Sequence, residues 1–272
     1  MYLGIDVGGT KTLVAALSDQ GKIVEQAKFP TPIEYDGFKL KLEAVLAGFK
    51  NKDFKAGGIG SAGMIDRKNG RLINWTNIPW KDIPLQADLE KLAGCPMVLE
   101  NDAKMGGLSE AMLLKDQFSR VLYIAIGTGI GIALIVDCKI DSNFGDGGGR
   151  ALMLEHQGKL TSWEEFASGR ALVERFGKEA ADITDEAVWQ SYSRDLSQGL
   201  LQLIAMVEPD CIVIGGSVGR YFGRFSHFLK TGLEKHSLPL VTMPNAVLPA
   251  KRPEEAVIFG CYDLAKQVYG HA

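Results

Sequence analysis

Two aspartates occupy positions at which a carboxylate could serve phosphoryl chemistry. Asp6 lies within the apolar run at residues 3–7, and Asp102 lies between an apolar run and a helical pattern that begins at residue 103. A charged carboxylate in an apolar strand is costly unless something compensates it, and Mg²⁺ beside bound phosphates would do so. Asp102 could accept the proton of a substrate hydroxyl as a general base. The ordinary alternatives are helix capping for Asp102 and capping of the following turn for Asp6.

Two glycine-rich turns, at residues 8–12 and 127–131, supply backbone N–H groups that could bind phosphate. Glycine lets consecutive N–H groups converge on an anion, and lysine and hydroxyl groups add donors. The sequence has no P-loop pattern, and a strand rather than a helix follows the first turn, which excludes a dinucleotide fingerprint. One such turn alone would be an ordinary hairpin turn, but the matching pair favours phosphate binding. The residues that we expect to bind phosphate are Gly8, Gly9, Thr10, Lys11, Thr128 and Gly129.

A third glycine-rich segment, residues 215–219, follows the apolar run at residues 211–214. Glycines at the carboxyl edge of a strand allow a flat ring to lie against the backbone, which would suit an adenine. A plain connection between a strand and a helix explains the segment equally well. The residues of this segment that could contact such a ring are Gly215, Gly216 and Ser217.

The elements that must position these residues follow an internal repeat. Residues 3–17 and 122–136 each contain an apolar strand, a short glycine turn and a second apolar strand. Helical spacing of apolar residues at 40–49 and 196–207 separates further short strands. Alternating strands and helices predict an α/β fold with mostly parallel sheets.

The repeat suggests two domains built on the same plan. We expect an N-terminal domain over residues 1–116 and a C-terminal domain over residues 117–253, because the polar residues around 116 precede the second hairpin. The last helix, within residues 254–272, is a candidate to complete the first domain.

Composition narrows the function classes. The chain has 272 residues, with 46% hydrophobic and 23% charged residues and a net charge of −3, the balance of a soluble globular protein. No broad basic surface is expected, so nucleic acid and membrane surfaces are not predicted partners. No stretch approaches the ~20 apolar residues of a membrane span, and no leader precedes the first strand. We therefore expect a cytoplasmic protein.

The four cysteines lie far apart, mostly in apolar runs, without a C-x₂-C pair. They are predicted to be buried, reduced thiols rather than zinc ligands or disulfides. The cysteines are Cys95, Cys138, Cys211 and Cys261.

The motifs together resemble the ROK family of sugar kinases, within the actin/hexokinase/Hsp70-like ATPase superfamily. Five motifs stand in that family's order and spacing across essentially the whole chain, at residues 3–12, 58–66, 101–103, 127–131 and 215–219. The resemblance implies two actin-like (ribonuclease H-like) domains with ATP and sugar in a central cleft. It makes Asp102 the catalytic base rather than only a cap, the two turns phosphate loops and residues 215–219 the adenosine loop. A homodimer is the family expectation.

The resemblance also implies the sugar-binding residues. Asn77 and Asn101 match asparagines that face the sugar in relatives, and Glu164 falls on a glutamate that contacts sugar hydroxyls. For Glu164 the alternative is a solvated glutamate at a helix start, favoured by the helix dipole. The substrate-binding candidates are Gly63, Asn77, Asn101, Asp102 and Glu164.

The departures from the family concern the sugar pocket. Family members carry Gly-Glu-x-Gly-His and then a cysteine-rich zinc motif, whereas residues 147–158 here contain neither. Glu155 and His156 are adjacent, so in a strand they would point to opposite faces. We expect no zinc.

The sequence therefore predicts ATP- and Mg²⁺-dependent phosphorylation of a sugar hydroxyl. Polyphosphate as the donor, a sugar-sensing regulator and a non-catalytic partner protein remain as alternatives. The regulator is disfavoured because the first strand starts at Tyr2 with no helix-turn-helix ahead of it.

Overall fold

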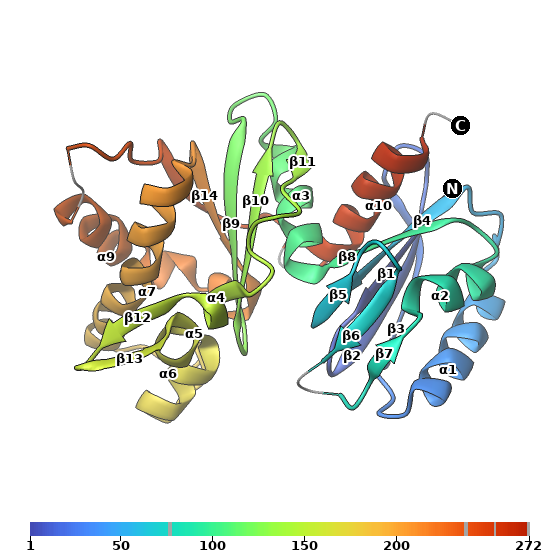
Figure 1. Ribbon diagram of the computed structural model, residues 1–272, viewed down its shortest axis with the longest axis horizontal. Helices are drawn as coiled ribbons and strands as arrows, with labels where there is room; N and C mark the ends of the chain where they lie inside the picture. Colours follow the sequence, from blue (N-terminus) through green and yellow to red (C-terminus); the bar gives the residue numbers. More distant parts are fainter. Residues whose placement is uncertain (76–77, 237–238, 253, 271–272) are drawn as a thin grey trace. The chain divides into compact units, whose positions relative to one another are not determined.

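The computed structural model describes residues 1–75, 78–236, 239–252 and 254–270. Its residues cluster into two compact units, one made of Met1–Ser109 with Glu255–Ala272 and the other of Glu110–Glu254. The division falls within helix α3, Asp102–Leu113. Each unit contains a five-stranded sheet with helices packed on it, and we describe the two separately (Figure 1).

The sheet of the first unit has the order β3-β2-β1-β4-β8. Strands β1, β2 and β3 are antiparallel, whereas β4 and β8 run parallel to β1. The strands are β1 Tyr2–Val7, β2 Lys11–Leu17, β3 Ile23–Pro30, β4 Ala56–Ser61 and β8 Met97–Asn101. A smaller antiparallel sheet contains β5 Met64–Asp66, β6 Arg71–Asn74 and β7 Lys81–Ile83. The other helices of this unit are α1 Tyr35–Gly48, α2 Leu85–Ala93 and α10 Ala256–Tyr269.

Helices cover the main sheet of the first unit through two separate apolar clusters. Phe38 of α1 and Leu85 of α2 belong to the cluster that includes Ile5 of β1. Ile258 of α10 belongs to a second cluster with Tyr2 of β1. Alternate side chains of a strand point to opposite faces, so the even and odd residues of β1 serve the two clusters. The unit is therefore layered, with helices on both sides of the sheet.

Glycines let α10 approach the sheet closely. A Cβ at Gly58 of β4 would lie 2.5 Å from the Cys261 carbonyl oxygen of α10. One at Gly60 would lie 2.3 Å from a Val257 methyl group, and one at Gly260 would lie 1.9 Å from the Met105 carbonyl oxygen of α3. The C-terminal helix is thus fitted against β4 and α3.

The second unit repeats the plan with the sheet order β11-β10-β9-β14-β15. Strands β9 and β10 form an antiparallel hairpin, and β14 pairs in parallel with both β9 and β15. The strands of the unit are β9 Arg120–Ile126, β10 Ile130–Val136, β11 Lys139–Ile140, β12 Met153–His156, β13 Lys159–Ser162, β14 Cys211–Gly215 and β15 Ala246–Pro249. Its helices are α4 Gly148–Ala151, α5 Trp163–Ala167, α6 Gly169–Phe176, α7 Glu186–Val207, α8 Gly216–Gly219 and α9 Phe222–Lys235.

Local sequence explains the longest helix and the central strand of this unit. The Asp185 side chain caps α7 by accepting the Ala187 N–H at 2.9 Å. The helix ends at Val207, followed by Glu208 with a φ of 40° and then Pro209, which cannot continue a helix. All residues of β14 are buried, as expected for a parallel strand covered on both faces.

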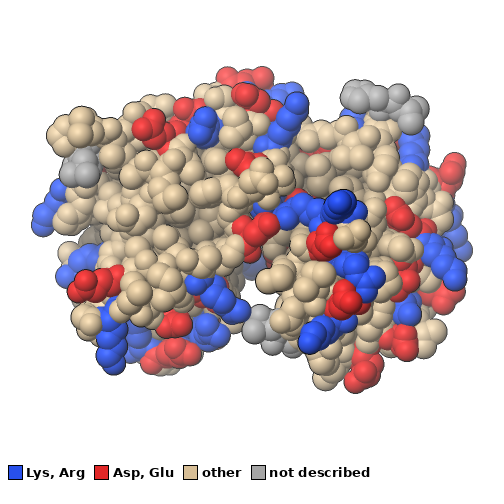
Figure 2. Space-filling view, viewed as in Figure 1, with Lys and Arg blue, Asp and Glu red and all other residues tan. Residues whose placement is uncertain are grey.

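The structure confirms the α/β class and both glycine-turn hairpins. It also places a helix over each of the two periodic segments, at α1 and α7. Of the four free cysteines, Cys95, Cys211 and Cys261 are buried as predicted, whereas Cys138 is half-buried. None of the helices that the structure describes combines the length and apolarity that crossing a membrane requires. On the face drawn in Figure 2, basic and acidic side chains of the described residues are interspersed.

Candidate functional site

The first glycine turn is a rigid hairpin at one edge of the first sheet. The Gly8 N–H donates to the Lys11 carbonyl oxygen at 3.1 Å, and a Cβ at Gly8 would lie 2.7 Å from the same oxygen. The Thr31 hydroxyl donates to the Gly8 carbonyl at 2.6 Å and lies 2.9 Å from the buried Thr12 hydroxyl. Gly9 lies in this turn, where Thr10 and Lys11 are exposed, so polar groups of the turn face solvent.

Parallel pairing brings three predicted site segments to that same edge. Val7 of β1 pairs with Ser61 of β4, which in turn pairs with Asn101 of β8. The residues that follow these three in the chain begin the glycine turn, the loop containing Gly63 and the helix that starts at Asp102. The register of the sheet therefore clusters candidates that lie nearly 100 residues apart in the chain.

Burial and charge both act on the carboxyl groups of Asp6 and Asp102. Burial, with a further contribution from the negative charge of Asp102, raises the pKa of Asp6 to about 7, while Lys11 and Lys28 act in the opposite direction. Burial also raises the pKa of Asp102, against the hydrogen bond that its Oδ1 accepts from the Ala103 N–H at 2.8 Å. Two neighbouring carboxylates in a poorly solvated place favour a shared cation or proton. A Mg²⁺ ion bound beside these carboxylates would offset the cost of their charge.

Asn101, rather than Asp102, caps helix α3. Its Oδ1 accepts the backbone N–H groups of Ala103 and Lys104 at 3.0 and 3.3 Å. Asp102 is the first residue of the helix, so the capping expected of it from local sequence is performed by its neighbour. Residues of both types are good caps, and local sequence does not choose between adjacent ones.

An ion pair between half-buried Arg67 and buried Glu100 adjoins the Asn101–Asp102 segment. Glu100 is 5% exposed and accepts Arg67 Nε and Nη2 at 2.7 and 2.6 Å. Its Oε1 also accepts the Asn101 N–H at 2.6 Å. Bidentate guanidinium–carboxylate pairs are strong and geometrically specific. The pairing of Arg67 with Glu100 was not predicted from the sequence, because the contact is long-range and no motif marks it.

The remaining candidates of the first unit differ in what the structure shows. Gly63 has a φ of 93°, and a Cβ there would lie 2.6 Å from the Asn74 carbonyl oxygen. The conformation of this loop therefore requires glycine at position 63. Asn77, the other predicted sugar ligand of this region, lies outside the described residues.

In the second unit, the side chain of Glu164 in α5 binds the backbone next to the second glycine turn. Its Oε2 accepts the Ile130 N–H at 3.0 Å, and its Oε1 accepts Arg150 Nη2 at 3.1 Å. A Cβ at Gly129 would lie 2.4 Å from Glu164 Oε2, so only glycine leaves room for this carboxylate. Glu164 is 8% exposed, which rules out the solvated glutamate considered from the sequence.

A pocket of about 530 Å³ lies beside that turn. Gly127 and Thr128 of the turn line it together with Ser217, so the structure brings two predicted ATP-binding segments to one place. Gly215 and Gly216 are not among the lining residues, and packing and backbone conformation explain why both are glycines. A Cβ at Gly215 would lie 2.3 Å from the Tyr123 hydroxyl, and Gly216 has a φ of 80°. The full lining is Gly127, Thr128, Gly169, Arg170, Val173, Glu179, Ala180, Ala181, Ser217, Val218, Arg220 and Tyr221.

Comparison with known proteins decides the family. The model of the ROK family matches residues 2–268. This chain belongs to the ROK family. A glucokinase of Streptomyces coelicolor is 32% identical over 196 residues, which are 68% of this chain and 62% of that protein. The match therefore spans less than two thirds of that relative's length.

Solved ROK structures share the fold. The chain superposes with a TM-score of 0.81 and 26% identity on a ROK family glucokinase from Streptomyces griseus in complex with glucose and AMPPNP, covering 98% of this chain and 99% of that one. It also superposes on an inorganic polyphosphate/ATP-glucomannokinase from Arthrobacter sp. strain KM, with a TM-score of 0.70, 26% identity and 95% of each chain covered. The two actin-like domains expected from the motifs are thus the fold of this ROK protein.

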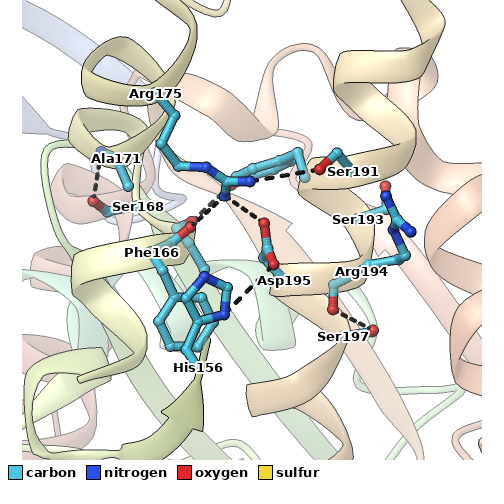
Figure 3. Close-up of polar contacts among 12 residues, drawn as sticks. His156, Phe166, Ser168, Ala171, Arg175, Ser191, Ser193, Arg194, Asp195 and Ser197 are labelled. Carbon is cyan, nitrogen blue, oxygen red and sulfur yellow. Dashed lines mark hydrogen bonds and ion pairs between the residues drawn. The ribbon is translucent and has the colours of Figure 1, made fainter. Parts of the chain in front are cut away.

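His156 of this ROK protein is used inside the second unit. Its ring stacks on Phe166, with centroids 4.1 Å apart, and its Nδ1 lies 3.8 Å from Asp195 (Figure 3). Asp195 also binds the guanidinium of Arg175. Glu155, one residue earlier, is exposed, so the two side chains point to opposite faces of β12 as predicted. His156 fastens the β12–β13 hairpin to α5 and α7.

The described residues offer few side chains that could bind a metal ion. Among the described residues, no group of three or more His, Cys, Asp or Glu side chains could hold a metal ion. Mg²⁺ is commonly held by one or two carboxylates together with substrate phosphates and water. Asp6, with Asp102 beside it, fits that pattern.

Proposed function

We propose that this protein transfers the terminal phosphoryl group of ATP to a hydroxyl group of a sugar. The observation that carries the proposal is the arrangement at the edge of the first sheet. There the glycine turn, Asp6 and the Asn101–Asp102 segment converge through strand register. Family membership and the likeness to the glucokinase solved with glucose and AMPPNP support it.

Asp102 is proposed as the general base. Its raised pKa makes the carboxylate a better proton acceptor than an ordinary surface aspartate. The Ala103 N–H holds its Oδ1, which fixes the carboxylate relative to α3. Asp102 thereby orients the acceptor hydroxyl and takes its proton as the phosphoryl group is transferred.

The sugar is proposed to bind beside Asp102. Asn101, Asn77 and the loop at Gly63 are the groups of the first unit assigned to its hydroxyls. Glu164 is assigned a different main task from the one its sequence position suggested, because Ile130 and Arg150 already engage its two oxygens. It shapes the donor turn, and any contact with sugar would share an oxygen with Arg150.

The donor is proposed to bind the pocket of the second unit. Thr128 supplies a hydroxyl and backbone N–H for phosphate, and the segment at residues 215–219 contributes Ser217 and Val218 to the wall for adenosine. The turn at residues 8–12 is proposed as the second phosphate loop. Mg²⁺ held by Asp6 supplies neutralisation of phosphate charge when bound.

Inorganic polyphosphate is a second candidate donor. The specific observation in its favour is the likeness to a glucomannokinase that uses polyphosphate and ATP. The residues that line the pocket include the glycine turn, Arg170 and Arg220, which suit any phosphate chain.

A parallel assay tests donor and acceptor together. The full chain is incubated with Mg²⁺, with either ATP or polyphosphate, and with each of a panel of hexoses and amino sugars. Formation of sugar phosphate is measured by mass spectrometry. We expect turnover of at least one sugar with ATP. If sugar phosphate forms with polyphosphate but not with ATP, polyphosphate rather than ATP is the donor. If no sugar is phosphorylated with either donor, the proposed function is wrong.

A further inference from the structure

Arginine side chains gather around Glu164 beside the pocket of the second unit. Arg150 donates to Glu164 Oε1 at 3.1 Å, and Arg170 Nη2 lies 3.9 Å from the same oxygen. Arg150 is the partner within hydrogen-bond distance, and Ile130 takes the other carboxylate oxygen at 3.0 Å. Arg150 is therefore the hydrogen-bonded partner of Glu164, whereas Arg170 lies beyond hydrogen-bond distance of that carboxylate.

The other ion pair of Arg170 is weak. Its Nε lies 3.9 Å from Glu174, whose side chain is 65% exposed. Neither of its carboxylate distances is that of a hydrogen bond, and an exposed pair one helical turn apart contributes little. If the Arg170 side chain bound a ligand anion, it would therefore give up only these two weak ion pairs.

The backbone holds Arg170 next to the glycine turn. The Gly169 N–H donates to the Gly127 carbonyl oxygen at 2.7 Å. A Cβ at Gly169 would lie 2.6 Å from that oxygen, so glycine at this position permits the close approach. Arg170 follows directly and lines the same pocket as Thr128 and Ser217.

We propose that Arg170 binds the phosphate chain of the phosphoryl donor. The inference rests on the proposed function in that it assigns this pocket to the donor. The ligand is a polyanion of linked phosphates, from a nucleoside triphosphate or from inorganic polyphosphate. Arg150 and Glu164 act as positioning residues, because their pair holds the turn and leaves the Arg170 guanidinium free of a hydrogen-bonded carboxylate.

Calorimetric titration of the full chain tests the inference. Wild type, Arg170→Gln and Arg170→Lys are each titrated with ATP, inorganic tripolyphosphate and adenosine. We expect Arg170→Gln to weaken binding of the two polyanions by about 10- to 100-fold, the size of a charged hydrogen bond, and to leave adenosine binding unchanged. Arg170→Lys should lose less, because it keeps the charge but not the fork of donors.

Arg194→Gln is the matched control, because Arg194 of α7 (Figure 3) is exposed and is not among the residues that line the pocket. It should bind every ligand like the wild type. Unchanged affinity of Arg170→Gln for both polyanions would overturn the inference, as would an equal loss for adenosine or wild type that binds neither polyanion. Adenosine binding by the wild type identifies a nucleotide as the source of the phosphate chain, whereas tripolyphosphate binding without it identifies inorganic polyphosphate.

The two proposals fail separately. If no sugar is phosphorylated but Arg170→Gln still weakens polyanion binding selectively, the proposed function is wrong and the assignment of Arg170 holds. If sugar is phosphorylated and the KM for the donor is the same in wild type and Arg170→Gln, the assignment of Arg170 is wrong.

Discussion

Burial changes the acid–base properties of single residues in this protein. Asp6 is the clearest case, because its carboxyl group lies half-buried in the first sheet with a pKa raised to about 7. The unfolded chain holds this group near its ordinary value of 3.8. Between those values the folded state binds more protons than the unfolded state, so stability falls as pH rises toward 7.

The first prediction follows from that sign. Without nucleotide and with EDTA present, Asp6→Asn should raise Tm more at pH 8 than at pH 4.5, because the asparagine removes a charge that the folded state tolerates poorly. Scanning calorimetry at the two pH values measures the difference. An equal change at both would show that Asp6 is not perturbed by burial.

Arg67 gives a second prediction for a single residue. Removing it leaves the buried Glu100 carboxylate without its bidentate partner, which is expected to lower the free energy of unfolding by about 3 kcal/mol. Urea unfolding of Arg67→Met measures this. The double variant Arg67→Met, Glu100→Gln should recover part of the loss, because no buried charge remains. A double variant as unstable as the single one would contradict the account.

At the scale of elements, the two glycine turns differ in what holds them. The first is held by the hydroxyl groups of Thr12 in β2 and of Thr31, which follows β3, whereas the second is held by the Glu164 carboxylate from α5. The second turn is thus sensitive to any atom added between it and Glu164. Gly129 is the position where this sensitivity is greatest.

Gly129→Ala is therefore expected to displace Glu164 and to weaken donor binding about tenfold or more, because the Ile130 N–H loses its charged acceptor. Titration with ATP or tripolyphosphate measures the effect. Gly223→Ala is the control, since a Cβ there meets nothing within 4 Å and the residue lies in helix α9. It should be neutral or slightly stabilising. Equal donor affinity in both variants would contradict the assigned role of Glu164.

Sequence patterns predicted these elements better than the contacts between them. Both hairpins followed from an apolar strand on each side of a glycine turn, and α7 followed from its periodicity and its stop before Pro209. The contact of Glu164 with Ile130 spans 34 residues, so no local pattern could reveal it. Helix α3 is capped by Asn101 rather than by Asp102, a difference of one residue. Sequence propensities do not locate a helix end that finely.

At the scale of the whole molecule, the chain leaves the first unit and returns to it. Residues 255–272 join the first unit, although they follow the entire second unit in the sequence. Helix α10 covers one face of the first sheet through Ile258 and Tyr262 and approaches β4 where glycines allow it. The first unit is therefore incomplete without the end of the chain.

Deletion of residues 255–272 should expose that face of the first sheet and make Met1–Ser109 sensitive to protease, because an apolar layer loses its cover. The second unit has its own core and should resist. Limited proteolysis with mass spectrometry locates the cuts. Cuts spread equally over both units, or none beyond those in the full chain, would contradict this division.

The protein is proposed to phosphorylate a sugar, with Asp102 as the group that takes the proton of the acceptor hydroxyl. The most direct measurement is the rate of sugar phosphate formation by wild type, Asp102→Asn and the control Asp116→Asn, which changes an exposed aspartate. The account predicts that Asp102→Asn lowers kcat by about 10²- to 10⁴-fold while Asp116→Asn matches the wild type. Full activity of Asp102→Asn would contradict it.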